Sequence, residues 1–424
     1  MSYIFLIVNI VFYGILFHSY YKKRGFDITC YVISIYGFVA LIGLYLACHP
    51  MSGGHFLEAN ILSLLYFFIA FCITLKPVSN CARITPGSIV EPSKPFFTAF
   101  MLFVALITLI RFPGLISNIS RNFILMLYDT SYLSGRYEEM ANAGVSGFST
   151  GSYNVVPILG GMIDEIAVFL LMYYLTRPNR KLWITVVLFI ASVLSPLGAL
   201  VQARRGSMAF AILSFGAYYL LFKDCFTYKI KTIVRRIIIV VVAAITCGMT
   251  IITISRFSKS YMDDNYATYS MVYYVGQPMH YFCETIDPNG CRWGDRTIPL
   301  FKSIITDGAY TYSARTTKYQ SMKLGEEVFS TYFGEILLDF GPILGFLFLL
   351  LLIGFLNKLG PGAKTQFQFY ELIPIMMVID LLICGWTQSP FSDVGGNLHF
   401  IFILLMYLFF KLSAHQKCQK VCYQ

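Results

Sequence analysis

Two adjacent arginines in a short connection between two apolar runs are the residues of this chain best suited to chemistry. Arg204 and Arg205 stand there, and Gly206 and Ser207 follow them at the predicted start of a helix. A guanidinium presents a planar fork of donors that matches phosphate oxygens, and a helix N-terminus adds backbone N–H donors. The four residues therefore predict a binding site for an anion such as a diphosphate. Anchoring of both arginines to lipid headgroup phosphates is the alternative.

Acidic residues within apolar runs are a second feature of this kind. Glu335 and Asp339 are four residues apart in a predicted helix, so both lie on one helix face. A carboxylate placed there could act as a general base that deprotonates a hydroxyl group. Asp164 and Asp380 also lie within apolar runs, where an ionisable group is costly and serves either a functional site or a tie to another helix.

The longest polar passage of the chain, residues 255–331, combines basic, acidic and tyrosine residues. Long loops inside compact proteins are usually functional or disordered. Its many tyrosines argue against disorder, because disordered segments are depleted in aromatic residues. We therefore predict a folded lid or groove on one face of the membrane. Candidate groups within it for binding phosphates and sugars are Arg256, His280, Arg296 and Arg315.

Two of the eleven cysteines share this passage. Residues 288–290, Pro-Asn-Gly, lie between Cys283 and Cys291 and favour a turn that would bring the two together. A disulfide between them and two free thiols are both open at this point. The remaining cysteines show neither a disulfide framework nor the ligand spacing of a zinc site.

The elements that must position these residues are membrane helices. Hydrophobic residues make up 57% and charged residues 13% of the 424 residues, and the mean hydropathy is +0.66. Crossing a hydrocarbon core takes about 20 apolar residues in a helix, and the chain supplies such runs repeatedly. We predict an all-α polytopic membrane protein with about eleven transmembrane helices and a large external loop. The predicted spans are 3–19, 28–48, 57–75, 96–110, 154–175, 182–202, 206–222, 233–254, 332–356, 370–388 and 397–412.

The net charge of +10 has a membrane explanation. Lys and Arg collect in short cytoplasmic loops, and every second connection of this chain is basic, beginning with Lys22, Lys23 and Arg24. The alternation predicts an external N-terminus and a cytoplasmic C-terminus. It also places Arg136 in an external loop. The predicted divisions are helices one to eight in 1–254, with an external loop near 111–153; the large external loop 255–331; and 332–424, with three helices and a cytoplasmic tail.

The ionisable residues expected at the outer surface suit an anionic, lipid-linked sugar. Arginines would bind a diphosphate, and tyrosines would stack on sugar rings. An arginine beside the leaving diphosphate would stabilise the charge that develops as the sugar–phosphate bond breaks. This chemistry needs no metal or other cofactor, and the closest approach to a metal-binding Asp-x-Asp motif outside, Asp263–Asp264, is adjacent rather than spaced.

With these features the chain resembles the bacterial oligosaccharide repeat-unit polymerases, also called O-antigen or capsule polymerases. The resemblance rests on the number of helices, the late external loop, and the short motifs Arg204–Ser207, Tyr274–Gly276 and Asp339–Gly345. Members of that family use external arginines to handle undecaprenyl-diphosphate-linked sugars. Related O-antigen ligases also use a loop histidine, to which His280 would correspond. The resemblance implies substrate contacts for Arg204, Arg205, Arg256 and Arg315.

The resemblance implies a metal-independent glycosyltransferase of the bacterial inner membrane. It would move a growing glycan from its diphospholipid to a sugar hydroxyl of the next lipid-linked unit. Its partners would be the lipid-linked oligosaccharide, membrane lipids, a chain-length regulator and a flippase, without nucleic acid. A flippase, which needs basic residues in a deep cavity rather than a large loop, and an O-antigen ligase, which differs in its acceptor, are the alternatives. The expected residues are Arg205, Arg315, Glu335 and Asp339 for catalysis, and Arg136, Arg204, Arg256, His280 and Arg296 for substrate binding.

Overall fold

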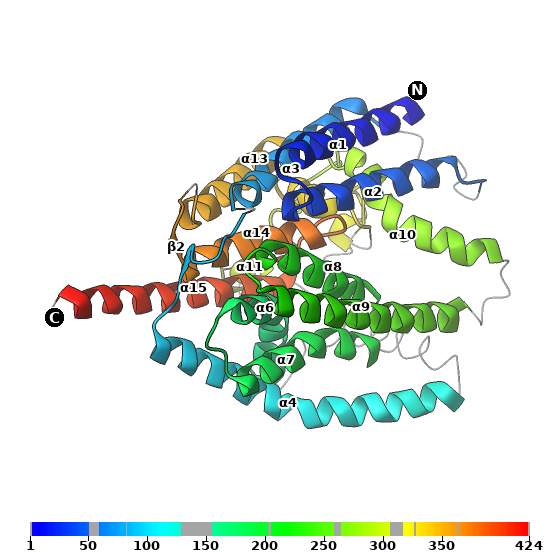
Figure 1. The fold of residues 1–424 in the computed structure, drawn as a ribbon. Helices are drawn as coiled ribbons and strands as arrows, with labels where there is room; N and C mark the ends of the chain where they lie inside the picture. The colour runs from blue at the N-terminus through cyan, green and yellow to red at the C-terminus, as the bar shows by residue number, and fades with distance from the viewer. Residues whose placement is uncertain are drawn as a thin grey trace. The chain divides into compact units, whose positions relative to one another are not determined.

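The computed structural model describes residues 2–50, 59–81, 83–128, 155–201, 205–257, 264–305, 317–325, 328–362 and 364–422. Among these residues, ten helices are long and apolar enough to cross a membrane. The protein is therefore an all-α polytopic membrane protein (Figure 1). The ten helices are α1 (Ser2–Arg24), α2 (Ile28–Cys48), α3 (Ile61–Cys81), α4 (Lys94–Tyr128), α6 (Val155–Thr176), α7 (Leu182–Val201), α8 (Arg205–Phe222), α9 (Tyr228–Phe257), α13 (Thr331–Leu359) and α15 (Asp393–Cys422).

Shorter or less apolar elements complete the described part of the chain. α10 is as long as a membrane span but more polar, and α14 is apolar but has only 13 residues. These elements are α10 (Asp264–Glu284), α11 (Pro299–Ile305), α14 (Leu372–Cys384), the 3-10 helix η2 (Phe369–Glu371), and the two-residue strands β1 (Ile89–Val90) and β2 (Phe367–Gln368).

A helix overlaps every predicted span, and several of these helices differ notably in length from the prediction, among them the fourth and the tenth. The fourth span, predicted over 96–110, is part of the longer α4, which continues through Arg111 and Pro113. The tenth, predicted over 370–388, contains the short α14, whose residues 372–383 are all buried. Backbone that is not helical is tolerated at membrane depth when protein encloses it. The burial of α14 therefore explains how so short a helix can end there.

Contacts within the chain divide it into two compact units, and each unit is discontinuous in sequence. One unit comprises Met1–Arg83 and Asp263–Phe409, and the other comprises Ile84–Met262 and Phe410–Gln424. These units cut across the linear divisions predicted at 254/255 and 331/332. The first unit contains both the start of the chain and most of the polar passage, because α2 and α3 pack against elements that follow residue 263.

Helices α1, α2, α3, α13 and α14 pack together in the first unit (Figure 1). Two buried hydroxyls link them across long sequence separations. Tyr36 of α2 donates a hydrogen bond to the carbonyl oxygen of Leu382 in α14 (3.0 Å), and Tyr332 of α13 donates to Oγ1 of Thr74 in α3 (2.9 Å). Satisfying these hydroxyls matters because an unpaired polar group is costly in such surroundings.

Much of the passage predicted as a loop, residues 255–331, is helical. α9 continues to Phe257, and α10 packs along α2. The crossing is close because Gly276 of α10 faces Gly43 of α2: a Cβ at Gly276 would lie 3.0 Å from the carbonyl oxygen of Ile42. Small residues allow such close approach between membrane helices. Several of the tyrosines that favour a folded lid therefore lie in α10, a helix that packs within the bundle.

The second unit contains α4, α6, α7, α8 and α9. Nη1 of Arg111 in α4 donates to Oδ1 of Asp164 in α6 at 2.9 Å. The arginine crosses Gly160, where a Cβ would lie 2.2 Å from its guanidinium. Of the two roles predicted for Asp164, the structure thus provides the tie to another helix.

Candidate functional site

A break in α13 organises the charged residues of the first unit. Gly341 has φ +75° and ψ 171°, which is not helical, and Pro342 follows it. Pro342 has no backbone N–H that could donate to the carbonyl oxygen of Leu338. The break also displaces the backbone N–H that would otherwise donate to the carbonyl oxygen of Asp339. Their two carbonyl oxygens instead accept hydrogen bonds from the backbone N–H groups of Arg292 (2.9 Å) and Trp293 (2.7 Å). The carbonyl groups released by the break therefore attach a segment to α13, and this segment contains Arg292 and Arg296.

The side chain of Asp339 strengthens the same attachment. It is fully buried, and its Oδ2 accepts hydrogen bonds from the backbone N–H groups of Arg296 (3.2 Å) and Thr297 (2.6 Å). Among the described residues, no group donates a hydrogen bond to its Oδ1. Asp339 thus fixes the position of the backbone from which the Arg296 side chain extends.

Glu335, one turn before Asp339, receives mainly side-chain donors. Its Oε1 accepts from Nη2 of Arg296 at 3.3 Å. Its Oε2 accepts from Oγ of Ser392 at 2.7 Å and from the backbone N–H of Ser389 at 2.8 Å. Glu335 is buried, whereas the Arg296 side chain is 12% exposed. The two residues form an ion pair in which the cation is the more accessible member.

The chain after α14 closes this end of the site. The carbonyl oxygens of Gly385 and Thr387 accept hydrogen bonds from the first N–H groups of α13, those of Tyr332 (2.8 Å) and Thr331 (2.9 Å). The first N–H groups of a helix have no intrahelical acceptors. These hydrogen bonds therefore explain why the non-helical segment after α14 lies at the start of α13. Nε of Arg296 also lies 3.5 Å from Oδ1 of the half-exposed Asp393.

Arg292 is the second cation of the cluster. Its guanidinium donates to the carbonyl oxygen of Gly325 (3.1 Å) and lies over the ring of Tyr319, 5.0 Å from its centroid. Burial lowers the pKa of Arg292 from its ordinary value, and the nearby carboxylates of Asp339 and Glu335 oppose that effect. Arg292 and Arg296 therefore both lie near the two buried carboxylates.

Asp295 forms an adjoining buried cluster. It pairs with Nζ of Lys302, with Nζ of Lys318 at 2.6 Å, and with the hydroxyl of Tyr319 at 2.9 Å. Burial raises the pKa of Asp295, but the hydrogen bonds from Lys302, Lys318 and Tyr319 outweigh burial and lower it overall. This cluster fixes the segment 317–325 to the segment that precedes α11.

Three of the predicted site residues, Glu335, Asp339 and Arg296, come together here. His280 lies elsewhere: its Nε2 donates to the carbonyl oxygen of Gly43 at 2.8 Å, which makes it part of the α2–α10 crossing. Arg205 is the first residue of α8 in the second unit and is partly buried. Arg136, Arg204 and Arg315 lie outside the described residues, as does the side chain of Arg256.

The disulfide considered between Cys283 and Cys291 is not formed in the structure, where both are free cysteines. Sγ of Cys283 donates weakly to the carbonyl oxygen of Met279 at 3.6 Å. Cys291 lies beside the break in α13, with its Sγ 3.6 Å from the position of a Cβ on Gly341. Because the backbone after Cys291 is bonded to α13, the two thiols are held by different neighbours.

Ser389, Ser392 and Asp393 are not among the predicted site residues, whereas Arg292 is one of the external arginines expected to suit a diphosphate. The three lie in a short polar connection that lacks Lys and Arg, and this composition was their only signal in the sequence. Within the described part of the chain, no three His, Cys, Asp or Glu side chains are grouped so that they could hold a metal ion. What the site offers is a guanidinium, 12% exposed, that is paired with a buried carboxylate.

Comparison of the chain with protein-family models, with curated proteins and with solved structures finds no match. The chain is a polytopic membrane protein with a charged cluster built on a broken helix, and this cluster is the feature that points to a function.

Proposed function

We propose that this protein is a membrane glycosyltransferase that polymerises undecaprenyl-diphosphate-linked oligosaccharide units at the outer face of a bacterial inner membrane. The observation that carries the proposal is the pair of Arg296, 12% exposed, and buried Glu335 in α13. A partly exposed guanidinium suits a diphosphate, and a carboxylate beside it suits a general base.

In the proposed reaction, a hydroxyl of the acceptor sugar attacks the anomeric carbon of the donor glycan, and the bond from that carbon to the diphosphate breaks. Arg296 binds the diphosphate and stabilises the charge that develops on it. Because Arg296 then releases Oε1 of Glu335, this oxygen accepts the proton of the hydroxyl. Further contacts with the lipid-linked substrates are proposed for Arg136, Arg204, Arg205, Arg256 and Arg315.

The test measures polymer formed from lipid-linked oligosaccharide units by purified protein in liposomes, per unit of inserted protein. Glu335→Gln removes the base and should lower the rate by about 10²–10⁴-fold. Arg296→Lys keeps the charge but loses the planar fork, and should lower it by roughly tens to thousands of fold. Glu371→Gln is the matched control, because Glu371 pairs with Lys364 at 2.5 Å, away from the site.

Wild-type polymer formation by both Glu335→Gln and Arg296→Lys would remove this pair from the reaction. Deletion of the gene in its host distinguishes the alternatives by gel analysis of the surface polysaccharide. Single repeat units support a polymerase. Long unligated chains would indicate a ligase, and loss of all surface polysaccharide would indicate a flippase.

A further inference from the structure

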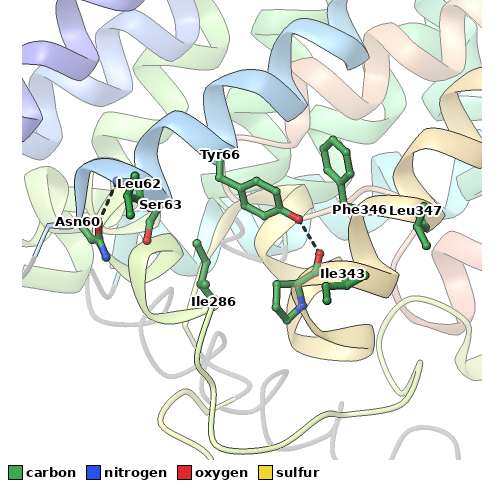
Figure 2. A pocket seen from close by; sticks show the side chains of 9 residues that line it. Asn60, Leu62, Ser63, Tyr66, Ile286, Ile343, Phe346 and Leu347 are labelled. Carbon is green, nitrogen blue, oxygen red and sulfur yellow. Dashed lines mark hydrogen bonds between the residues drawn. The ribbon is translucent and has the colours of Figure 1, made fainter.

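An open groove of about 610 Å³ lies between α3 and the part of α13 that follows the break (Figure 2). Two of its polar atoms already have partners. The Tyr66 hydroxyl donates to the carbonyl oxygen of Pro342 at 2.5 Å, and Oδ1 of Asn60 accepts from the N–H of Leu62 at 2.9 Å. The groove thus presents mainly hydrocarbon. Its apolar lining comes from Leu62, Ile286, Ile343, Phe346 and Leu347, with the ring of Tyr66.

The groove is continuous with the lipid-facing surface of the protein. Leu62, Ile343 and Leu347 are 71%, 75% and 49% exposed. Exposed residues of this type on membrane helices face lipid. An occupant of the groove would therefore enter from the bilayer, and its chemistry would be that of a hydrocarbon chain.

The groove and the charged cluster share both of their structural elements. In α13, Pro342 lines the groove and follows Asp339 by three residues, less than one helical turn. In the segment after α10, Ile286 lines the groove, and Arg292 and Arg296 reach the cluster. One break in α13 therefore produces an apolar hollow on one side and a site for charged groups on the other.

We propose that this groove binds the polyprenyl chain of the lipid-linked substrate, starting from the end of the chain nearest the diphosphate. The proposal rests on the proposed function, which supplies a lipid with a diphosphate head. A substrate with its first isoprene units in the groove has its head beside the break, where Arg296 binds it. The groove and Arg296 would therefore bind the chain and the diphosphate head of one lipid at the same time.

The experiment uses the full-length protein in nanodiscs and two photoactivatable probes. One is undecaprenyl diphosphate with a diazirine in its chain, and the other is phosphatidylglycerol with a diazirine in an acyl chain. We expect the polyprenyl probe to label residues 60–66 and 343–347, and unlabelled undecaprenyl diphosphate to compete with it. Ile343→Trp should fill part of the groove and reduce this labelling at least about tenfold. A loss of this size is expected when about two methylene groups of the lipid chain are no longer buried in the groove.

Leu351→Trp is the matched control, since Leu351 is 74% exposed on the same helix, outside the groove. It should label as wild type does. If Ile343→Trp lowers the amount of inserted protein, Leu62→Trp fills the groove from α3 instead. Equal labelling by both probes, or undiminished labelling of the tryptophan variants, would overturn the assignment.

The two proposals fail separately. Polymer formation by a protein whose groove is not labelled by the polyprenyl probe overturns the groove assignment and leaves the glycosyltransferase. Competed labelling of the groove in a protein that forms no polymer supports the groove assignment and removes the polymerase reaction.

Discussion

Glu335 and Asp339 share a helix face, but the groups that donate to them differ. Glu335 accepts hydrogen bonds from the side chains of Arg296 and Ser392 and from the backbone N–H of Ser389. Asp339 is bonded to the backbone N–H groups of Arg296 and Thr297, which cannot leave without detaching the segment. The prediction that both acids are catalytic is therefore refined: we expect Glu335 to take part in chemistry and Asp339 to be a positioning residue.

Substitutions of Asp339 should separate these roles. Asp339→Asn keeps a carbonyl oxygen for the two backbone N–H groups, so it should retain most polymer formation and thermal stability. Asp339→Ala leaves both donors buried without an acceptor, at a cost of about 1–3 kcal/mol for each. The readouts are the unfolding midpoint in detergent and polymer per unit of inserted protein. An Asn variant with normal stability and no activity would instead identify Asp339 as the base.

Asp295 gives the protein a pH dependence at acid pH. Its pKa is lowered in the folded state below the ordinary value of 3.8. A carboxylate with a lowered pKa stabilises the fold above the unfolded-state pKa, and this stability is lost as pH falls through the folded-state pKa. Asp295→Asn should therefore lower the unfolding midpoint at pH 7. The difference between wild type and variant should shrink below about pH 4. A difference that is constant from pH 7 to pH 3 would contradict this role.

At the scale of the element, the break in α13 is what gathers the site. A continuous helix would use the carbonyl oxygens of Leu338 and Asp339 internally, and it would leave no attachment for Arg292 and Trp293. Gly341 makes the break possible, because φ +75° with ψ 171° is a conformation that only glycine adopts readily.

Gly341→Ala should therefore destabilise the protein by about 1–3 kcal/mol through backbone strain. Steric conflict is not the cause, since the nearest atom to an added Cβ would be Sγ of Cys291 at 3.6 Å. Gly354→Ala, in the same helix and in open space, should cause no loss. The measurement is thermal unfolding of both variants. Equal midpoints would show that the break does not depend on Gly341.

At the scale of the whole molecule, the short α14 carries the chain back along α13. The segment after α14 bonds to the first residues of α13 through Gly385 and Thr387, and Lys364 precedes α14 at the other end. α14 thus returns the chain to the end where α13 begins, although it is too short to be recognised as a span by length.

Reporter fusions test the orientation of the protein. Fusions after Lys181, Lys231 and Lys364 should report the cytoplasm, because basic connections remain there. Fusions after Pro299 and Ser392 should report the outside. A cytoplasmic signal after Pro299 would place the charged cluster on the wrong side for the proposed reaction. A fusion after Tyr153, which lies outside the described residues, should also report the outside.

The sequence alone determined the fold class and the location of the long apolar helices. This is because hydrocarbon requires long apolar helical runs that satisfy their own backbone groups. It also placed Glu335 and Asp339 on one helix face, since that depends only on local helical geometry. The sequence could not predict the length of α14, because burial by other helices, rather than the thickness of the bilayer, determines where that helix ends.

Only the tertiary structure decided which cations meet those carboxylates. Arg296 is 39 residues from Glu335, and Ser392 is 57 residues from it. Their meeting depends on the break at Gly341 and on the carbonyl groups that the break releases. His280 shows the same limit, because its role in the α2–α10 crossing depends on Gly43, 237 residues away. Contacts of this kind follow from the packing of helices, which residue types and local spacing do not specify.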